Sequence, residues 1–290
     1  MRDTNHLTRT YMDSLLVELR QLDCTIPDTT FHLFGETFAT PIMTAALSHL
    51  DNHHSGGMVE LARGAKEANA VLWYGYGEDA ELEEILATGA KTIKIIKPFK
   101  ERKEIYRKIE HAKRAGVFAL GMDIDHGYDK FGQYDMNALM CGITTSELKD
   151  FITNAEIPFI VKGVLSVQDA LKCAEAGAAG IVVSHHHGIM DYAVPPLMVL
   201  PEIREAVGPE MKVFVDCGIG SGADAFKSIA LGADAVSVGR AMLDSFRTEG
   251  AAAVRNAIVQ MTRELAGYMA HTAAADLSHI DGSVVRSLDR

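Results

Sequence analysis

The feature that most constrains the fold is a recurring junction, in which a glycine ends a helical segment and an apolar strand-like run follows. It reads ATGAKTIKI, RAGVFALGMD, EAGAAGIVVS and LGADAVSVG, with the glycines at Gly89, Gly116, Gly177 and Gly232. Glycine suits this place because the end of a helix often needs a left-handed backbone, which glycine adopts without steric cost. Each junction therefore predicts a turn from a helix into a strand.

The junctions belong to a longer alternation of short apolar runs with helical patterns. The predicted strands cover residues 40–45, 70–75, 91–96, 118–123, 158–163, 180–185, 212–217 and 235–240. Strands that alternate with helices pair in parallel through right-handed crossovers, and this number of units predicts a single-domain α/β protein with a closed (β/α)₈ (TIM) barrel. An open, doubly wound sheet is the alternative.

The chain is expected to consist of a barrel and a segment that precedes it. We expect the barrel to span residues 40–290 and residues 1–39 to form a helical lead-in. The segment 10–22 reads as an amphipathic helix, which would close the bottom of the barrel or bind a neighbouring subunit.

Composition narrows the class of protein and its partners. The 290 residues carry a formal net charge of −11, which disfavours binding to nucleic acid or to an anionic membrane. The sequence has neither an apolar run long enough for a membrane span nor a signal-peptide core. The four cysteines are widely spaced and form no CxxC pair, as is typical of a reducing compartment. We therefore expect a cytoplasmic protein that acts on a small molecule.

Polar residues gather where the predicted strands end. Asp123 ends the fourth strand, Asp216 lies at the end of the seventh, and Ser184 begins the run SHHHG at the end of the sixth. Lys162 lies within the fifth strand, where a charge is costly unless it is paired or bound to a ligand. Ligands of such barrels bind at the carboxyl ends of the strands, so these residues predict the functional site.

Two glycine-rich turns follow the last two strands. They read DCGIGSGADAF and SVGRAM, and each opens a helix. Backbone N–H groups at a helix start bind anions, and Arg240 adds a charge with bidentate geometry. Because this is the usual phosphate position of the barrel, the turns predict a phosphate site.

These residues carry a resemblance. The segments VKGVLSVQDALKCAEAGAAGIVVSHHHG and VFVDCGIGSGADAFKSIALGADAVSVGRAM resemble the FMN-dependent α-hydroxy-acid oxidase and dehydrogenase family, which includes glycolate oxidase and lactate oxidase. The resemblance is close over residues 158–277 and looser over 40–123. It implies an FMN flavoprotein, an oxidoreductase that acts on CH–OH groups, and a homo-oligomer of four or more subunits.

The resemblance also implies roles for individual residues. His186 is expected to be the catalytic base, with Asp123 as its partner, and the base would take a proton from the substrate while hydride passes to the flavin. His187 is the alternative base; His186 is preferred because strand alternation would point it to the same side as Ser184. The expected cofactor-binding residues are Lys94, Lys162, Ser184, Asp216, Gly218, Gly220, Gly239 and Arg240.

The substrate side departs from the family pattern. Ile189 stands where the resemblance expects an arginine for the substrate carboxylate, and Ile96 stands at the expected strand-three tyrosine. Gly220 likewise takes the place of an arginine in the phosphate turn. Lys130 and His187 are the expected substitutes for substrate binding. The substrate is therefore expected to be a 2-hydroxy acid or an altered hydroxylated molecule.

Two other functions remain open from the sequence. The histidines and acids of SHLDNHHSGG (residues 48–57), DIDH (123–126) and SHHHG (184–188) would face one mouth, where they could hold a metal for a lyase or hydrolase reaction. Consecutive strand residues alternate faces, so three adjacent histidines cannot all bind one ion, and we expect no metal. The third possibility is a flavin or phosphate-ligand binding protein without turnover.

Overall fold

The computed structural model describes residues 3–134 and 139–288. Its centre is a sheet of parallel strands in the hydrogen-bonded order β4-β11-β10-β9-β8-β7-β6-β5. A bridge between Leu47 and Tyr74 brings the two end strands, β4 and β5, side by side and nearly closes the barrel. The predicted (β/α)₈ barrel is confirmed. The strands are β4 (Ile42–Thr44), β5 (Leu72–Tyr74), β6 (Thr92–Ile96), β7 (Ala119–Asp123), β8 (Phe159–Val164), β9 (Gly180–Val183), β10 (Lys212–Val215) and β11 (Ala235–Val238).

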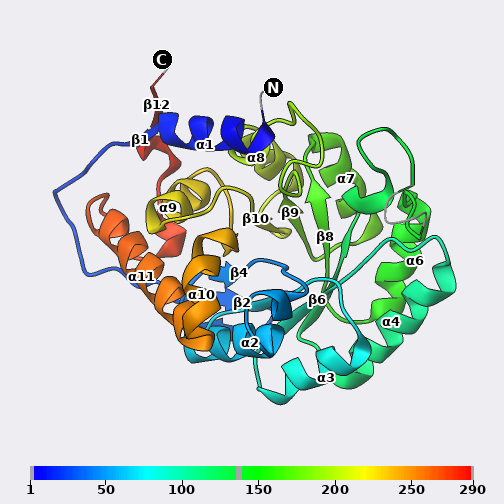
Figure 1. Cartoon of the computed structure of the whole chain (residues 1–290). Helices are drawn as coiled ribbons and strands as arrows, with labels where there is room; N and C mark the ends of the chain where they lie inside the picture. The colour runs from blue at the N-terminus through cyan, green and yellow to red at the C-terminus, as the bar shows by residue number, and fades with distance from the viewer. Residues whose placement is uncertain (1–2, 135–138, 289–290) are drawn as a thin grey trace.

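Helices surround the barrel, as Figure 1 shows. Gly116 and Gly177 cap their helices with φ values of 84° and 89°, the left-handed conformation that the junctions predict. The surrounding helices are α2 (Gly57–Glu67), α3 (Asp79–Ala87), α4 (Arg102–Ala115), α6 (Thr145–Ala155), α7 (Val167–Ala176), α8 (Pro196–Val207), α9 (Gly222–Ala230), α10 (Leu243–Glu249) and α11 (Ala251–Ala270). Short 3₁₀ turns lie at η1 (Leu50–Asn52), η2 (Asp125–Gly127), η3 (Arg240–Met242), η4 (Leu277–His279) and η5 (Gly282–Val284).

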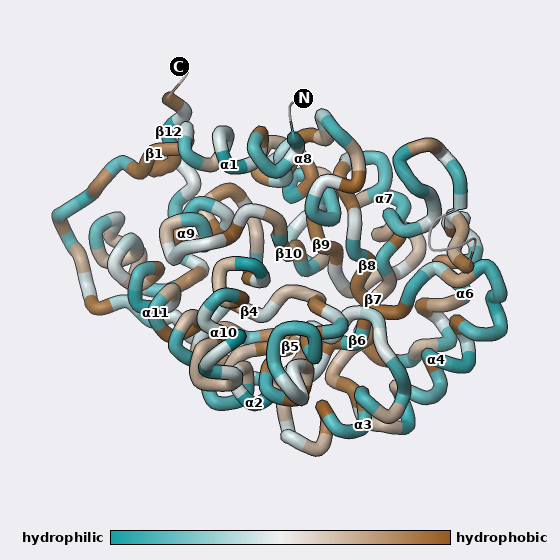
Figure 2. The backbone as a smooth tube through the Cα atoms, viewed as in Figure 1, coloured by the Kyte–Doolittle hydropathy of each residue, from teal (hydrophilic) through white to brown (hydrophobic). Residues whose placement is uncertain are grey.

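Strand residues alternate between two cores. Ile93 and Ile95 point into the barrel, where they join Trp73 and Phe214, whereas Ile96 packs outward against the helices. Burial of this apolar surface on both faces is the main favourable contribution to folding. Figure 2 shows the result, with hydrophobic strands inside a largely hydrophilic outer ring.

The lead-in differs from the expected helix. The helix α1 covers Thr4–Ser14, and the residues after it form β1 (Leu15–Val17), which pairs with β12 (Val285–Ser287) near the C-terminus. Met12 is buried, whereas Leu19 and Leu22 are exposed, so the buried face lies earlier in the chain than the pattern suggested. Figure 1 shows α1 beside α8, and Thr8 of α1 contacts His185, just beyond the end of β9.

A β-hairpin closes the bottom of the barrel in place of a helix. Its strands are β2 (Phe31–Leu33) and β3 (Glu36–Phe38). Phe31, Leu33 and Phe38 are buried in the same cluster as the residues inside the barrel. The hairpin therefore lies at the end of the barrel opposite the carboxyl ends of its strands.

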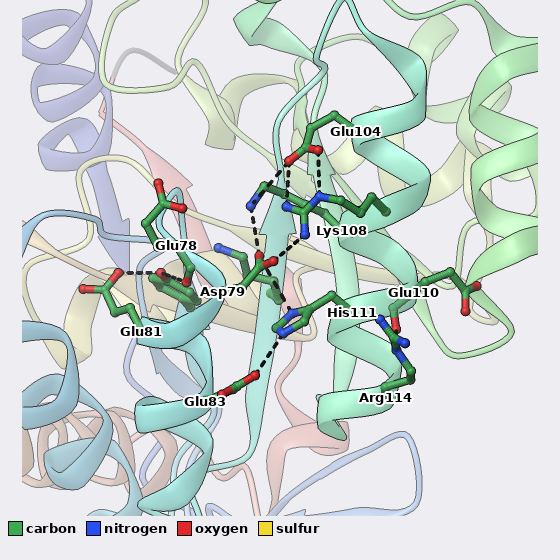
Figure 3. Close-up of polar contacts among 12 residues, drawn as sticks. Glu78, Asp79, Glu81, Glu83, Glu104, Lys108, Glu110, His111 and Arg114 are labelled. Atoms are coloured by element: carbon green, nitrogen blue, oxygen red, sulfur yellow. Dashed lines mark hydrogen bonds and ion pairs between the residues drawn. The ribbon is translucent and has the colours of Figure 1, made fainter.

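Polar side chains form ion pairs between neighbouring outer helices. Asp79 at the start of α3 pairs with Arg107 and Lys108 of α4, and His111 Nε2 lies 3.1 Å from Glu83 Oε1 (Figure 3). These groups are only partly buried, and such pairs each contribute little to stability, so the network forms mainly a polar outer face. Among the described residues, no helix is both long and apolar enough to cross a membrane.

Candidate active site

A pocket of about 400 Å³ opens at the carboxyl ends of the barrel strands. Its lining brings together α1, the segment after β4, and the ends of β8 to β11. The residues that line it are Asn5, Arg9, Ala45, Ala46, Leu47, Lys162, His186, His187, Asp216, Cys217, Gly218, Ile219, Ser237, Gly239 and Arg240. The pocket has two ends. Lys162 and His186 lie at one of them, which we call the catalytic end. Gly218, Gly239 and Arg240 form the other, the phosphate end.

Buried charges at the catalytic end are paired. Lys162 Nζ lies 3.2 Å from Asp123 Oδ1 and 3.5 Å from Asp216 Oδ2, and Lys97 forms a second ion pair with Asp123. Burial alone would raise the pKa of Asp123, but Lys162 and Lys97 outweigh it and hold that pKa well below its usual value. Burial would lower the pKa of Lys162, but Asp123 and Asp216 raise it well above its usual value. Asp123 and Lys162 are therefore both ionised at neutral pH.

Lys97, directly after the third barrel strand β6, is the lysine that pairs with Asp123. Lys94, which was expected to bind the cofactor, does not line the pocket. Lys94 points outward from β6, where its ammonium lies 3.5 Å from the centre of the Tyr74 ring and donates to the Gly75 carbonyl. Burial lowers the pKa of Lys94 to about 7. Ile93 and Ile95 point into the barrel, so the next residue on that face is Lys97. Lys94 and Lys97 are three positions apart, an odd number, so they lie on opposite faces of the chain where β6 ends.

His186 lies between an acid and a second histidine. Its Nδ1 is 3.1 Å from Asp125 Oδ1 and 3.2 Å from Lys162 Nζ, and its Nε2 is 2.7 Å from His126 Nε2. An ionised carboxylate only accepts hydrogen bonds, so in the tautomer with a proton on Nδ1, His186 donates to Asp125 Oδ1 and its Nε2 carries the lone pair. His126 then donates from Nε2, and the lone pair of His186 Nε2 is the basic site.

A glycine makes room for this arrangement. Gly163 lies at a shift in register of β8, and its φ is 91°. A Cβ at this position would lie 2.4 Å from Asp125 Cγ. The sequence VKGV therefore places Lys162 in the site and leaves space for Asp125 beside it.

The three consecutive histidines separate because β9 ends at Val183 and a turn follows. His186 and His187 have φ values of 47° and 60°, and the Ser184 hydroxyl accepts the His186 N–H at 3.0 Å. His185 is buried under α1, with Nε2 2.8 Å from Thr8 Oγ1. Thus His186 does reach Lys162, but through the turn and not through strand alternation. Ser184 supports the turn and is not part of the pocket lining.

His187 faces the phosphate end. Its Nδ1 lies 2.7 Å from Asn5 Oδ1, and burial together with the nearby Arg240 lowers its pKa. A neutral imidazole is a poor anion partner, which weighs against the expected role in binding a substrate carboxylate. Lys130 is exposed, with Nζ 5.1 Å from the centre of the Phe131 ring, and is not among the residues that line the pocket.

The phosphate end combines Gly218, Gly239 and the exposed Arg240. A Cβ on Gly239 would lie 3.1 Å from the Ala45 Cβ, so bare backbone is needed where this loop meets the end of β4. Gly220 departs from its expected role, because its N–H donates to Asp224 Oδ2 at 3.0 Å. That N–H is therefore not free to donate to a phosphate.

Asp123, His126 and His186 have ligand atoms within 4.8 Å of one another, the type of group that could hold a metal. Two ammonium groups already contact Asp123, which disfavours a dication there. The histidines of the first loop do not join this group. His54, for example, packs 5.6 Å from the Phe246 ring.

Several site residues were not found from the sequence. Lys97 could be assigned to the site only by knowing which face of β6 points into the barrel. Ala45, Ala46 and Leu47 are apolar, so nothing in their side chains indicates a ligand site. Asn5 and Arg9 come from the lead-in, whose position no local pattern could reveal.

The residues present fit FMN. A lysine stands at one end of the pocket, and at the other a guanidinium accompanies glycine-rich backbone at the start of α9, a donor set suited to a phosphate dianion. The small side chains Ala45 and Ala46 add apolar surface to the lining.

Comparisons with known proteins agree with this geometry. The model of the family "FMN-dependent dehydrogenase" matches residues 3–138 and 128–287. Glycolate oxidase of Spinacia oleracea is 28% identical over 301 residues, covering 90% of this chain and 81% of that protein. For 4-hydroxymandelate oxidase of Amycolatopsis orientalis, the identity is 29% over 294 residues, with 89% and 82% covered.

Solved structures give the same result. A mandelate oxidase variant with 4-Br-2-hydroxy-methylphenylacetate superimposes with a TM-score of 0.91 at 27% identity, covering 98% of this chain and 91% of that one. One explanation covers the buried ion pairs, the histidine beside them and the phosphate end. The chain belongs to the FMN-dependent dehydrogenase family and is an FMN-dependent oxidoreductase.

Proposed function

We propose that the protein oxidises the hydroxyl-bearing carbon of a small 2-hydroxy acid, with His186 as the base. The observation that carries this proposal is the His186 side chain itself, which presents a basic Nε2 beside the pocket while Asp125 holds Nδ1. The relatives named glycolate oxidase and 4-hydroxymandelate oxidase support the substrate class.

Carboxylates and ammonium groups surround His186 in this proposal. The ammonium groups of Lys97 and Lys162 face the carboxylates of Asp123, Asp125 and Asp216, which leaves one negative charge in excess. A proton taken from the substrate hydroxyl makes His186 an imidazolium and balances that charge. Bound FMN supplies the acceptor for two electrons.

Lys162 has a second task in this proposal. It lines the pocket and is buried, so its charge acts in a medium of low dielectric. We propose that it offsets negative charge on the bound cofactor, while its two carboxylates keep the ammonium group in position.

His126 is the proposed partner of the substrate's anionic group. Ile189 cannot bind a carboxylate, and Lys130 and His187 are poorly suited for the reasons above. His126 is not itself among the lining residues, but its Nε2 lies 2.7 Å from Nε2 of His186, which is. A substrate whose hydroxyl reaches His186 would thus bring its neighbouring carboxylate to His126 as a hydrogen-bond donor.

Two further proposals concern the protein as a whole. We propose a homo-oligomer, which the exposed Leu19, Leu22 and Ile26 of the lead-in support, with exposed fractions of 58%, 83% and 97%. We also propose a cytoplasmic location, which the four free cysteines support. Light scattering during size-exclusion chromatography tests the first, and fractionation of the source cells tests the second.

The proposed reaction is tested by mixing the FMN-loaded protein anaerobically with a panel of 2-hydroxy acids. Bleaching of the flavin absorbance by at least one of them, and not by the matching compounds without the hydroxyl, is the expected result. A loaded protein that none of the panel reduces would refute the proposed substrate class. His126→Asn should then raise the substrate concentration needed for half-maximal reduction, whereas His54→Asn should not.

A further inference from the structure

We propose that α1 completes the phosphate end of the pocket, and that Arg9 makes this end able to accept the FMN phosphate by neutralising Asp224. The inference rests on FMN binding, which the proposed function also requires. It assigns to the lead-in a direct part in holding the cofactor.

One face of α1 covers the pocket. Asn5, Thr8, Arg9 and Met12 follow one another at intervals of three, one and three residues, so they share a side of the helix. Thr8 bonds to His185, and a Cβ on Gly218 would lie 2.8 Å from Met12 Sδ. The helix therefore packs directly on the loops after β9 and β10.

Asn5 connects two of the loops that line the pocket. Its Nδ2 donates to the His187 carbonyl at 3.0 Å, and its Oδ1 accepts from Arg240 Nη2 at 3.2 Å. Arg240 is otherwise a long, exposed side chain with many conformations. The contact with Asn5 orders its guanidinium at the edge of the pocket.

Arg9 addresses an electrostatic conflict at the start of α9. The Asp224 carboxylate is buried there and accepts the Gly220 N–H, so its negative charge stands beside the turn expected to meet a phosphate. Like charges this close would repel. Arg9 donates to Asp224 Oδ1 at 2.9 Å and to Oδ2 at 3.1 Å, and also to the Gly218 carbonyl at 3.2 Å.

Arg9 compensates the buried charge of Asp224 at the helix start; it also pairs with Asp13 at 2.7 Å, but that carboxylate is exposed and largely solvated. The hydrogen bonds with Asp224 raise the pKa of Arg9 above its already high value, so the guanidinium stays charged. The backbone dipole of α9 and Arg240 then dominate the field felt by a phosphate. Without Arg9, Asp224 would oppose them.

The experiment compares FMN with riboflavin, which lacks the phosphate, by fluorescence titration of the flavin-free protein. For Arg9→Gln we expect FMN affinity to fall about tenfold or more, as for loss of a charge-assisted pair, with riboflavin affinity unchanged within about twofold. Asn5→Ala should have the same selective but smaller effect. His6→Ala, on the exposed side of α1, is the matched control and should change neither affinity.

The double variant Arg9→Gln/Asp224→Asn separates charge from packing. It should recover part of the FMN affinity, because the uncompensated carboxylate is gone. Unchanged FMN affinity in both Arg9→Gln and Asn5→Ala would overturn the proposal. An equal loss of affinity for FMN and riboflavin would also overturn it, since α1 would then act only on the fold. A wild-type protein that binds FMN but oxidises no hydroxy acid would refute the proposed reaction and leave this inference intact.

Discussion

The two ends of the pocket place their charges in opposite ways. At the catalytic end, Lys162 and Asp123 are 5% and 2% exposed, and each contacts more than one charged partner. At the phosphate end, Arg240 is exposed and its contact is with the neutral amide of Asn5. Removing one buried charge leaves its partners uncompensated, whereas an exposed cation is largely solvated. The first end should therefore govern both stability and chemistry, and the second should govern affinity for the cofactor.

The largest effect is expected from His186→Ala, which removes the base. The rate of flavin reduction by substrate should fall by about 10²- to 10⁴-fold, the usual contribution of general base catalysis. FMN affinity should stay within about twofold, because the phosphate end is intact. Stopped-flow absorbance and FMN titration measure the two quantities. A fully active variant would show that another group is the base, and His187→Ala would then be tested.

The second prediction concerns stability. Asp123→Asn leaves Lys97 and Lys162 with one carboxylate fewer, so the free energy of unfolding should drop by about 3 kcal/mol. The pKa of Asp123 is lowered in the folded state, so its contribution is present above the unfolded pKa of about 4 and is lost as pH falls below it.

Urea unfolding at pH 7 and at pH 3 checks this. The difference in stability between wild type and Asp123→Asn should shrink at the lower pH. Asp150→Asn, an exposed site on α6, is the control and should change stability by less than about 0.5 kcal/mol. An Asp123 variant as stable as the control would mean that the buried ion pairs contribute nothing net.

Arg240→Gln tests the phosphate end with a smaller expected effect. FMN affinity should fall about tenfold, while the rate of flavin reduction at saturating FMN should be unchanged. Arg63→Gln, exposed on α2, serves as the control. If Arg240→Gln left FMN affinity unchanged but raised the substrate concentration for half-maximal rate, Arg240 would belong to the substrate site.

Lys94→Met is expected to have the smallest effect on the pocket. FMN affinity should not change, since Lys94 lies between the sheet and the helices. The pKa of Lys94 is lowered to about 7 in the folded state, so wild-type stability should rise, relative to the variant, as pH increases from about 7 towards 10. Thermal unfolding at several pH values measures this. A loss of FMN affinity would return Lys94 to the cofactor site.

Much of the site followed from strand ends alone. Lys162, Asp123 and Asp216 were expected at the mouth because the carboxyl ends of parallel strands meet there, and the structure brings them into contact. Lys94 was misplaced because it lies on the outward face of β6, whereas Lys97, three positions later, pairs with Asp123. Gly220 was misplaced because its N–H is engaged by Asp224, a contact that a glycine-rich turn does not reveal.

The sequence by itself determined the number, order and type of the barrel elements, because apolar periodicity and helix-ending glycines are local properties of the chain. Only the tertiary structure decided where the three histidines point and that α1 covers the pocket. His186 turns into the site through a left-handed backbone beyond the end of β9, and Arg9 meets Asp224 across 215 positions of sequence. Contacts of that kind depend on how distant segments pack, and no local pattern encodes them.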